Sequence, residues 1–514
     1  MNSKYPYDNF YSLISYQGKT IPNDIALILG SKKIKYIDLL EKIDFFAGYL
    51  ESIGISKGDR VSLLLRNSVE FIISTFAINK IGAISVPINT FLKESELEYI
   101  ISNCGSKILI ASTIYEDTIN KMEIKDNILN FIIWEGRVEF SDEKNCSFDI
   151  ALDKKLSASY IKQELDDIFT ILYTSGTTGR PKGAMLTNKN IFSNIISGIE
   201  RLQIINKDRG ILFLPMFHSF TFTIGLLLPL YQGASNVIIP SIRPFSNIFK
   251  QALLHRVTIF ISIPDIYNAL AKTKLPWYFM WFNSIRVFIS GASPLHGKII
   301  NALHNKFKDI PLLEGYGLSE ASPAISINPL QKQKLSSVGL PLDNYKIKIV
   351  DEDKNELPLK SIGEIIVFGD NVMKGYWQDN SATEHTIING WLLTGDLGYI
   401  DEDGYLFIID RKKDIIISKG INIYPREVED MINNFDGILV SALIGEKNKE
   451  YGEIPVAYIE LDNGVKSIDN LKLKKYLKEN LADYKLPKNI HIIDNIPKNA
   501  TGKILKRALK ESLI

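Results

Sequence analysis

Apolar positions in the first quarter of the chain alternate between a helical spacing and short continuous runs. Between Leu39 and Leu50 they fall on one face of a helix that ends before Gly54, and residues 61–65 form a short apolar strand. The same order returns in helices 68–81 and 94–102, each followed by a strand, at 83–87 and 107–111. Strand, helix and strand in succession predict right-handed crossovers and a mostly parallel sheet covered by helices on both faces.

A second series with the same pattern follows residue 183. A helical pattern over residues 191–202 precedes apolar strands at 210–214, 237–240, 258–264 and 285–290. Residues 211–231 are apolar enough to be mistaken for a membrane span of about 20 residues. Because Pro215, His218 and Pro229 interrupt this run, we expect a buried strand, loop and helix instead.

The pattern of apolar and polar residues changes beyond Ser336. Short alternating strands at 345–350, 364–368 and 405–409, separated by turn residues, predict a small β unit. The charged stretch Asp-Arg-Lys-Lys at 410–413 interrupts this pattern and is our candidate hinge. The last hundred or so residues have an α+β pattern of their own, including a lysine-rich helix for which a solvated face is a better explanation than a nucleic-acid patch.

Length and composition limit the class of protein. A chain of 514 residues exceeds what one core organises, and 45% apolar with 23% charged residues is typical of a soluble globular protein. The net charge of +1 gives no reason to expect a nucleic-acid partner. Cys104 and Cys146 make neither a disulfide framework nor a metal-ligand spacing, and the N-terminus lacks the apolar core of a signal peptide, so we expect a cytoplasmic protein.

The strongest chemical signal is the run Tyr-Thr-Ser-Gly-Thr-Thr-Gly-Arg-Pro-Lys-Gly at residues 173–183, directly after an apolar strand. Its glycines let the backbone approach a ligand closely, while its hydroxyl groups, backbone N–H groups and Lys182 can surround phosphoryl oxygens. The run is not a Walker A loop, which requires Gly-x-x-x-x-Gly-Lys followed by Ser or Thr. It predicts a binding loop for a polyphosphate.

This run closely resembles the phosphate loop of the adenylate-forming superfamily, which comprises acyl-CoA synthetases, luciferases and peptide-synthetase adenylation domains. Further segments similar to the family's motifs follow in the family's order over nearly the whole chain, at 215–218, 289–295, 314–320, 389–398, 407–414, 420–425 and 497–505. The segments 407–414 and 420–425 resemble the fatty acyl-CoA synthetases in particular.

The resemblance implies an α/β fold. A large N-terminal domain, residues 1–410, would contain two doubly wound α/β subdomains and a small β-barrel and would bind AMP and the acyl group. A small, mobile α+β C-terminal domain, residues 411–514, would follow, with Lys413 at the hinge position.

The resemblance also implies the residues of the site. Catalytic roles fall to Lys503, the mobile lysine that bridges the carboxylate and the α-phosphate, to His218, which borders the carboxylate pocket, and to Thr174 and Glu320, which would also hold Mg²⁺. The phosphates would contact Thr174, Ser175, Gly176, Thr177, Thr178, Gly179 and Lys182. Adenine would lie against Gly291, Ala292, Ser293, Glu314, Gly315, Tyr316, Gly317 and Ser319. Asp396 would accept hydrogen bonds from both ribose hydroxyls, and Arg411 would contact the ribose or phosphate. Lys419 and Gly420 would approach the thiol donor after the domain rotates.

The function implied is ATP-dependent conversion of a medium- or long-chain fatty acid to acyl-AMP and pyrophosphate, followed by transfer to coenzyme A. ATP, Mg²⁺ and coenzyme A are the expected cofactors and co-substrates. Two alternatives stay open: transfer to the phosphopantetheine of an acyl carrier protein, and a non-catalytic acyl-nucleotide binding protein.

Residues 276–282, Pro-Trp-Tyr-Phe-Met-Trp-Phe, are unusually aromatic. Their side chains could enter a membrane interface, which would place the protein peripherally at the inner face of the membrane, or they could pack in the core. On general grounds we expect core packing, and we expect no transmembrane segment.

Overall fold

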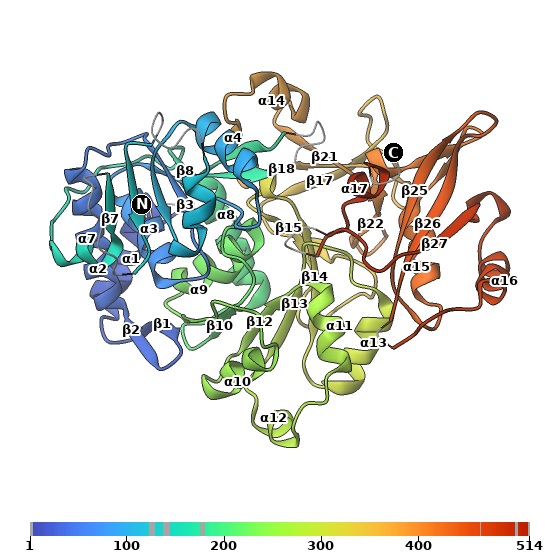
Figure 1. Cartoon of the computed structure of the whole chain (residues 1–514), viewed down its shortest axis with the longest axis horizontal. Coiled ribbons are helices and arrows are strands. Elements are labelled where there is room, and N and C mark those ends of the chain that lie inside the picture. The colour runs from blue at the N-terminus through green and yellow to red at the C-terminus, as the bar shows by residue number, and fades with distance from the viewer. Residues whose placement is uncertain are drawn as a thin grey trace.

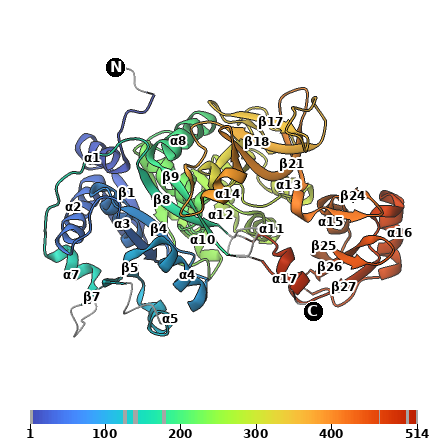
Figure 2. The same cartoon turned by 90° about the horizontal axis from the view of Figure 1, so that it is seen from above.

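A computed structural model of the chain describes residues 4–122, 129–136, 144–174, 180–462, 464–498 and 502–511. Two α/β units and a small β unit form the larger part of the molecule, and a C-terminal unit, orange to red in Figure 1, lies beside them. The view from above in Figure 2 shows the same C-terminal unit at one end of the elongated molecule.

The first unit is built on an eight-stranded sheet in the order β19-β9-β8-β4-β3-β5-β6-β7. The strands are β3 (Arg60–Leu64), β4 (Ile84–Pro87), β5 (Ser106–Ala111), β6 (Phe131–Trp134), β7 (Asn145–Ser147), β8 (Ile168–Thr174), β9 (Lys182–Thr187) and β19 (Gly375–Tyr376). From β8 to β7 all neighbours pair in parallel, as the helix and strand spacing predicts, whereas β9 and β19 are antiparallel additions.

The second unit contains a nine-stranded sheet in the order β16-β15-β14-β13-β12-β10-β11-β1-β2. The strands are β1 (Ile25–Leu29), β2 (Lys32–Lys35), β10 (Arg209–Leu212), β11 (Ser235–Ile238), β12 (Ile259–Ser262), β13 (Val287–Ser290), β14 (Leu312–Gly317), β15 (Ala324–Ile327) and β16 (Leu340–Pro341). Strand β1 pairs in parallel with β11, so the N-terminal hairpin completes the second sheet rather than the first.

Helices cover the two sheets. They are α1 (Phe10–Thr20), α2 (Tyr36–Ser52), α3 (Val69–Lys80), α4 (Glu94–Cys104), η1 (Thr113–Tyr115), α5 (Glu116–Asn120), α7 (Phe148–Asp153), α8 (Asn188–Leu202), η2 (Thr221–Leu227), α9 (Leu228–Tyr231), α10 (Ser246–Leu254), α11 (Pro264–Lys272), α12 (Trp277–Phe282) and α13 (Gly297–Lys306). The apolar run 211–231 forms the end of β10, a loop, the buried turns of η2 and helix α9, as expected. Among the described residues, no helix combines the length and the apolar character needed to cross a bilayer.

The small β unit is a five-stranded antiparallel sheet. Its elements are β17 (Lys346–Val350), β18 (Gly363–Phe368), β20 (Ile387–Ile388), β21 (Trp391–Ile400) and β22 (Leu406–Arg411), with η3 (Ser319–Ala321) and α14 (Asn380–Thr386) beside it. The chain then passes through η4 (Lys412–Asp414) into the C-terminal unit.

The C-terminal unit has its own sheet and its own apolar clusters. Its elements are β23 (Ile416–Ser418), β24 (Ile421–Ile423), α15 (Pro425–Asn433), β25 (Ile438–Asn448), β26 (Gly452–Leu461), α16 (Asn470–Asn480), η5 (Asp483–Lys485), β27 (Asn489–Ile492) and α17 (Lys506–Glu511). Leu473 and Leu477 of α16 are buried against the sheet side of this unit's apolar cluster, while the lysines of the helix are exposed, which is consistent with the expected solvated face.

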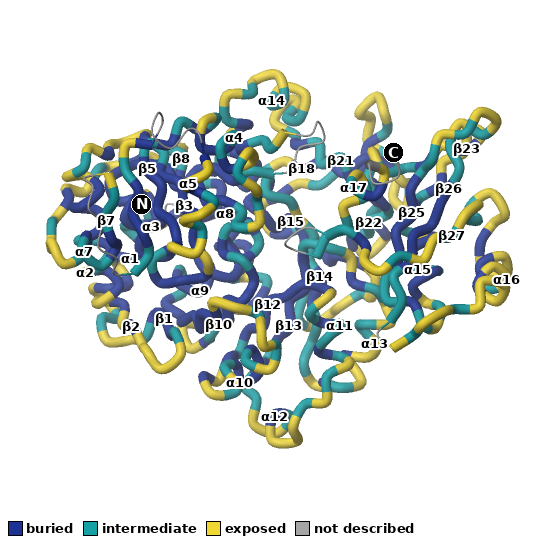
Figure 3. The backbone as a smooth tube through the Cα atoms, in the orientation of Figure 1, coloured by how far each residue is buried: buried dark blue, intermediate teal, exposed yellow. Residues whose placement is uncertain are grey.

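The aromatic segment 276–282 departs from expectation. Only Phe279 is buried, whereas Trp277, Trp281 and Phe282 are exposed (Figure 3). The prediction of core packing is therefore wrong for most of this segment. A local run of aromatic residues does not reveal which of them have tertiary neighbours.

Candidate active site

The predicted phosphate loop connects β8 to β9. These strands pair antiparallel, with Thr174 opposite Lys182 in the register, so residues 175–181 connect the two strands of a hairpin. The predicted residues Ser175, Gly176, Thr177, Thr178 and Gly179 lie outside the described residues. At the base of the turn the ammonium of Lys182 is 3.9 Å from Asp379 and lies over the ring of Tyr376.

Glu320 lies beside this hairpin. Its Oε1 accepts hydrogen bonds from Thr174 Oγ1, at 3.3 Å, and from the Tyr376 hydroxyl, at 2.9 Å. No group of three or more His, Cys, Asp or Glu side chains in the described parts of the chain could hold a metal ion. A single carboxylate with a hydroxyl neighbour nevertheless fits Mg²⁺, which commonly takes one or two carboxylates and completes its shell with phosphate oxygens and water.

Gly317 explains why the segment from Tyr316 to Glu320 can turn back towards the hairpin of β8 and β9. A Cβ atom at this position would stand 1.9 Å from the carbonyl oxygen of Pro323. The two backbones are therefore closer than any side chain allows, and glycine is required between Tyr316 and Glu320.

A cleft of about 760 Å³ opens between the second α/β unit, the small β unit and the C-terminal unit. The predicted residues that line it are Ala292, Ser293, Glu314, Gly315, Tyr316, Gly317, Asp396, Arg411 and Lys503. Residues separated by more than 200 positions in the sequence are thus brought to one cleft. Its volume and its mixed polar and apolar walls suit a nucleotide.

Asp396 is the acceptor at the centre of this cleft. It is buried on β21, opposite Arg411 on β22, and its Oδ2 accepts a hydrogen bond of 2.7 Å from the Tyr316 hydroxyl. The Nε of Arg411 is 3.4 Å from its Oδ1. Burial, together with the Asp396 charge, raises the pKa of Tyr316 well above its ordinary value, so the phenol stays protonated as a donor.

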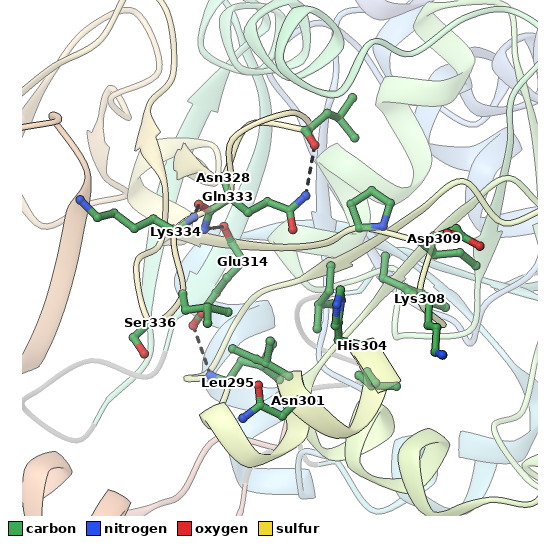
Figure 4. Close-up of a pocket in the computed structure, with 18 residues that line it drawn as sticks. Leu295, Asn301, His304, Lys308, Asp309, Glu314, Asn328, Gln333, Lys334 and Ser336 are labelled. Carbon is green, nitrogen blue, oxygen red and sulfur yellow. Dashed lines mark hydrogen bonds between the residues drawn. The ribbon is translucent and has the colours of Figure 1, made fainter. Parts of the chain in front are cut away.

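Glu314 is buried in the wall of the cleft. Its Oε1 accepts a hydrogen bond of 3.2 Å from the backbone N–H of Leu295, and burial raises its pKa to about 7 although Arg426 acts in the opposite direction. Glu314 also lines a second cavity of about 440 Å³, together with His304 and Asn328 (Figure 4). Glu314 therefore lines both cavities.

His218 and Ser219 lie outside the lining of the cleft but interact with residues at the site, His218 with the charge of Lys503 and Ser219 with Ser319. Burial, and the positive charge of Lys503, lower the pKa of His218 to about 4, so the imidazole is neutral near pH 7. The next residue, Ser219, lies 2.9 Å from Ser319 between the two hydroxyl oxygens, which connects this segment to the segment of Glu320.

Gly291 also lies outside the lining of the cleft. A Cβ there would meet the ring of Phe220 at 3.0 Å, so the glycine makes room for that ring.

Lys503 reaches this site from the C-terminal tail. Burial, and the nearby charge of Arg411, lower the pKa of its ammonium to about 8, while Asp396 acts in the opposite direction. Lys503 thus interacts electrostatically with three other predicted site residues, His218, Asp396 and Arg411.

A buried ion pair holds the tail in place, and sequence reasoning missed it. The ammonium of Lys506 is 2.8 Å from Oε1 of Glu429 on α15, and the same oxygen accepts a hydrogen bond from the backbone N–H of Leu443. The available signal in the sequence was that Lys506 and Glu429 occupy helix positions at which an apolar residue would be expected to face the interior. The reasoning also missed two contacts between the C-terminal unit and the rest, His296 with Asp430 at 2.7 Å and Lys498 with Asp265 at 2.9 Å.

Lys413, Lys419 and Gly420 also lie outside the lining of the cleft. Lys413 lies on η4, and burial lowers the pKa of its ammonium. Lys419 and Gly420 form the turn between β23 and β24, both with positive φ (51° and 77°), and the Lys419 ammonium lies over the ring of Tyr451. That turn requires a different placement of the C-terminal unit to approach the cleft.

Known proteins resemble this chain over its whole length. Residues 14–377 match the AMP-binding enzyme family, and residues 427–503 match the AMP-binding enzyme C-terminal domain. The chain is 32% identical to the long-chain-fatty-acid–CoA ligase of Escherichia coli O6:H1, over 98% of this chain and 95% of that protein.

Two solved structures are also similar to this chain over nearly its full length. The anthranilate CoA ligase AuaEII in complex with anthranoyl-AMP superposes with a TM-score of 0.91 at 27% identity, covering 98% of this chain and 97% of that one. The o-succinylbenzoate CoA synthetase MenE of Bacillus subtilis, in complex with ATP and magnesium ion, gives a TM-score of 0.84 at 29% identity, covering 98% and 99%. The fold and the coupling to coenzyme A are common to these proteins, while the acids that their names state differ.

The Lys506–Glu429 pair yields a stability prediction. Replacing Lys506 with Met leaves the Glu429 carboxylate buried without its partner, which should cost about 3 kcal/mol. We expect amide exchange in α17 and β25 to accelerate by about a hundredfold or more in hydrogen–deuterium exchange.

The matched control is Lys510→Met, on the exposed side of the same helix, which should change little. Adding Glu429→Gln to Lys506→Met should recover part of the loss. Equal effects of the Lys506 and Lys510 substitutions would show that the pair does not hold the tail.

Proposed function

This chain belongs to the AMP-binding enzyme family, and from that premise we propose that it activates a medium- or long-chain fatty acid with ATP and transfers it to coenzyme A. An AMP-forming acid–thiol ligase activity is common to the family members that it resembles over nearly its full length. The identity of the acid is the finer part of the proposal.

The observation that carries the proposal is the position of Lys503. A lysine from the C-terminal unit stands in a nucleotide-sized cleft beside His218, Arg411 and Asp396. In the first half-reaction a carboxylate oxygen of the acid forms a bond to the α-phosphorus of ATP, and the bond from that phosphorus to the bridging oxygen of pyrophosphate breaks. Two anions must approach each other, so a positioned cation between them lowers the barrier.

The remaining residues would orient the nucleotide. We assign the adenine to the wall formed by Ala292 and the face of Tyr316, and the ribose hydroxyls to Asp396 as acceptor. The turn after Thr174 would hold the phosphates, and Glu320 with Thr174 would hold Mg²⁺, which supplies charge neutralisation when bound. Neutral His218 would border the carboxylate without adding a charge.

The second half-reaction needs a second arrangement. The thiolate sulfur of coenzyme A forms a bond to the acyl carbon, and the bond from that carbon to the AMP oxygen breaks. We propose that residues 411–514 rotate as a domain about Lys413, withdrawing Lys503 and bringing the Lys419–Gly420 turn to the cleft. Polar contacts such as Lys498 with Asp265 can exchange water for protein partners at low cost.

The choice of a fatty acid rests on the segment after His218. Residues 217–230 are rich in Phe, Leu and Ile, and Phe220 contacts both large apolar clusters of the N-terminal part. An apolar wall next to the proposed carboxylate position suits an alkyl chain. The E. coli relative named above is a long-chain-fatty-acid ligase, which supports the same class.

Substitution of Lys503 separates the two half-reactions. For Lys503→Ala we expect pyrophosphate exchange dependent on the acid to fall by about 10² to 10³-fold, because a transition-state charge contact is lost. Thioester formation from preformed acyl-AMP should stay within about threefold of wild type, since that step does not use this lysine. Equal loss in both assays would refute the assignment.

The lowered pKa of Lys503 predicts that the pH–rate profile has a limb at alkaline pH, along which activity declines. The ammonium must be protonated to act, so kcat/KM for pyrophosphate exchange should fall as the pH rises through about 8, in place of the usual range above 10. Lys503→Arg retains its charge to much higher pH and should lose this limb, even at a lower maximal rate. A wild-type profile that stays flat to pH 10 would contradict the idea.

A series of acids and thiols tests the substrate class. We expect AMP release with coenzyme A to be fastest for straight-chain acids of medium or long length and weak for anthranilate or ferulate, because an apolar pocket discriminates by chain contact. A holo acyl carrier protein offered in competition should not displace coenzyme A. Preference for an aromatic acid, or for the carrier protein, would overturn that part, while no pyrophosphate release with any acid would overturn the whole proposal.

A further inference from the structure

Helix α12 presents an aromatic surface that the proposed reaction does not use. The side chains of Trp277, Tyr278, Trp281 and Phe282, here called the aromatic tip, are 72%, 46%, 81% and 67% exposed. Figures 1 and 3 show α12 at the lowest point of the molecule, below the second α/β unit and away from the C-terminal unit. The tip is convex and projects from the body of the protein.

The aromatic tip belongs to a regular helix that is fixed to the rest of the protein. Phe279 of the same helix is buried and meets Phe249 of α10 edge to face, with 5.8 Å between ring centroids. The Asn283 side chain donates hydrogen bonds to the carbonyl oxygens of Phe279, at 2.9 Å, and Met280, at 3.2 Å, which closes the helix end. One aromatic ring therefore anchors the helix and turns the other four outward.

The charge around the aromatic tip is one-sided. Residues 241–290 contain three lysines and three arginines but a single acid, Asp265, although the whole chain has a net charge of only +1. Two of these six cations are paired with acids from other segments, Lys272 with Asp462 and Arg286 with Asp208. That acid is bound to Lys498 of the C-terminal unit. Lys274 is exposed just before α12, and Lys250 is exposed on α10, one helical turn before the exposed Leu254. The tip is therefore flanked by cations.

We propose that the aromatic tip docks the protein onto the surface of a lipid bilayer that contains anionic headgroups. Tryptophan and tyrosine favour the headgroup region because their rings are apolar while their N–H and O–H groups stay hydrated. Lys250 and Lys274 would contact lipid phosphates, each adding attraction that falls off within a Debye length.

The size of the aromatic tip argues against a protein partner. Four partly exposed aromatic side chains offer about 600 Å² of surface at most. A stable protein interface uses about 800 Å² on each partner and needs surrounding area to exclude water, which a convex tip does not provide. Insertion into a deformable bilayer has no such requirement.

Cosedimentation of the full chain with vesicles tests the proposal. We expect binding to vesicles made of equal parts phosphatidylcholine and phosphatidylglycerol, weaker binding to phosphatidylcholine alone, and loss of binding at high salt. Trp277→Ser/Trp281→Ser, and separately Lys250→Gln/Lys274→Gln, should each lower the partition coefficient by about tenfold.

Matched controls come from another lysine-rich surface. Leu471 on α16 is 81% exposed, as Trp281 is, and Lys472 and Lys475 lie beside it. Leu471→Ser and Lys472→Gln/Lys475→Gln should leave the partition coefficient unchanged. All variants should retain wild-type pyrophosphate exchange with a water-soluble acid, so a failure of docking is distinguishable from a failure of the proposed chemistry.

Two results would overturn the proposal. One is equal sedimentation of the wild type and the Trp277→Ser/Trp281→Ser variant with both kinds of vesicle, including no sedimentation of either. The other is a wild-type dimer in solution that this variant converts to monomers, because the tip would then be an interface between two copies of the chain.

Brominated lipids should quench the tryptophan fluorescence of the wild type but not that of the Trp277→Ser/Trp281→Ser variant.

Discussion

A lysine ammonium held in a partly dehydrated cleft is the constraint on which the rest of the site depends. Burial opposes the charge on Lys503, and Arg411 opposes it further, so its pKa falls to about 8 although Asp396 and Asp414 favour the cation. A bound carboxylate and triphosphate would reverse this balance. The group is therefore least stable as a cation when the site lacks anions, which fits the proposed withdrawal of Lys503 after the phosphoryl chemistry.

The position of this ammonium depends on contacts made elsewhere. Lys506, one turn further along the tail, is fixed to Glu429 inside the C-terminal unit, so Lys503 moves with that unit as a body. The contacts from that unit to the remainder include polar pairs, with His296 against Asp430 and Lys272 2.5 Å from Asp462. Partly exposed pairs of this kind contribute little net free energy. A tail that is anchored inside its own unit, and polar pairs of small net free energy towards the remainder, fit the proposed rotation of the domain.

Much of the fold follows from the sequence because the helical and strand periods are local properties. The parallel strands β3 to β6 and the buried run 211–231 are examples. Pairings between distant segments do not follow, and so Leu27 against Asn236 and Gly375 against Met185 could not be predicted. The cleft residues were predictable from motifs, whereas Tyr376 and Glu429 belong to no motif. Their importance appears only once the chain brings Glu320 and Lys506 beside them.

The segment from Tyr316 to Glu320 shows why motif and geometry must be taken together. Tyr316 donates to Asp396 at the proposed ribose position, and Glu320 accepts from Thr174 at the base of the phosphate turn. Only three residues lie between Tyr316 and Glu320, so the backbone limits the distance between these two ends. Gly317 permits the close approach to Pro323 that sets its direction. A substitution there would displace both ends at once, and the spacing between ribose and phosphate recognition is therefore a property of one short turn.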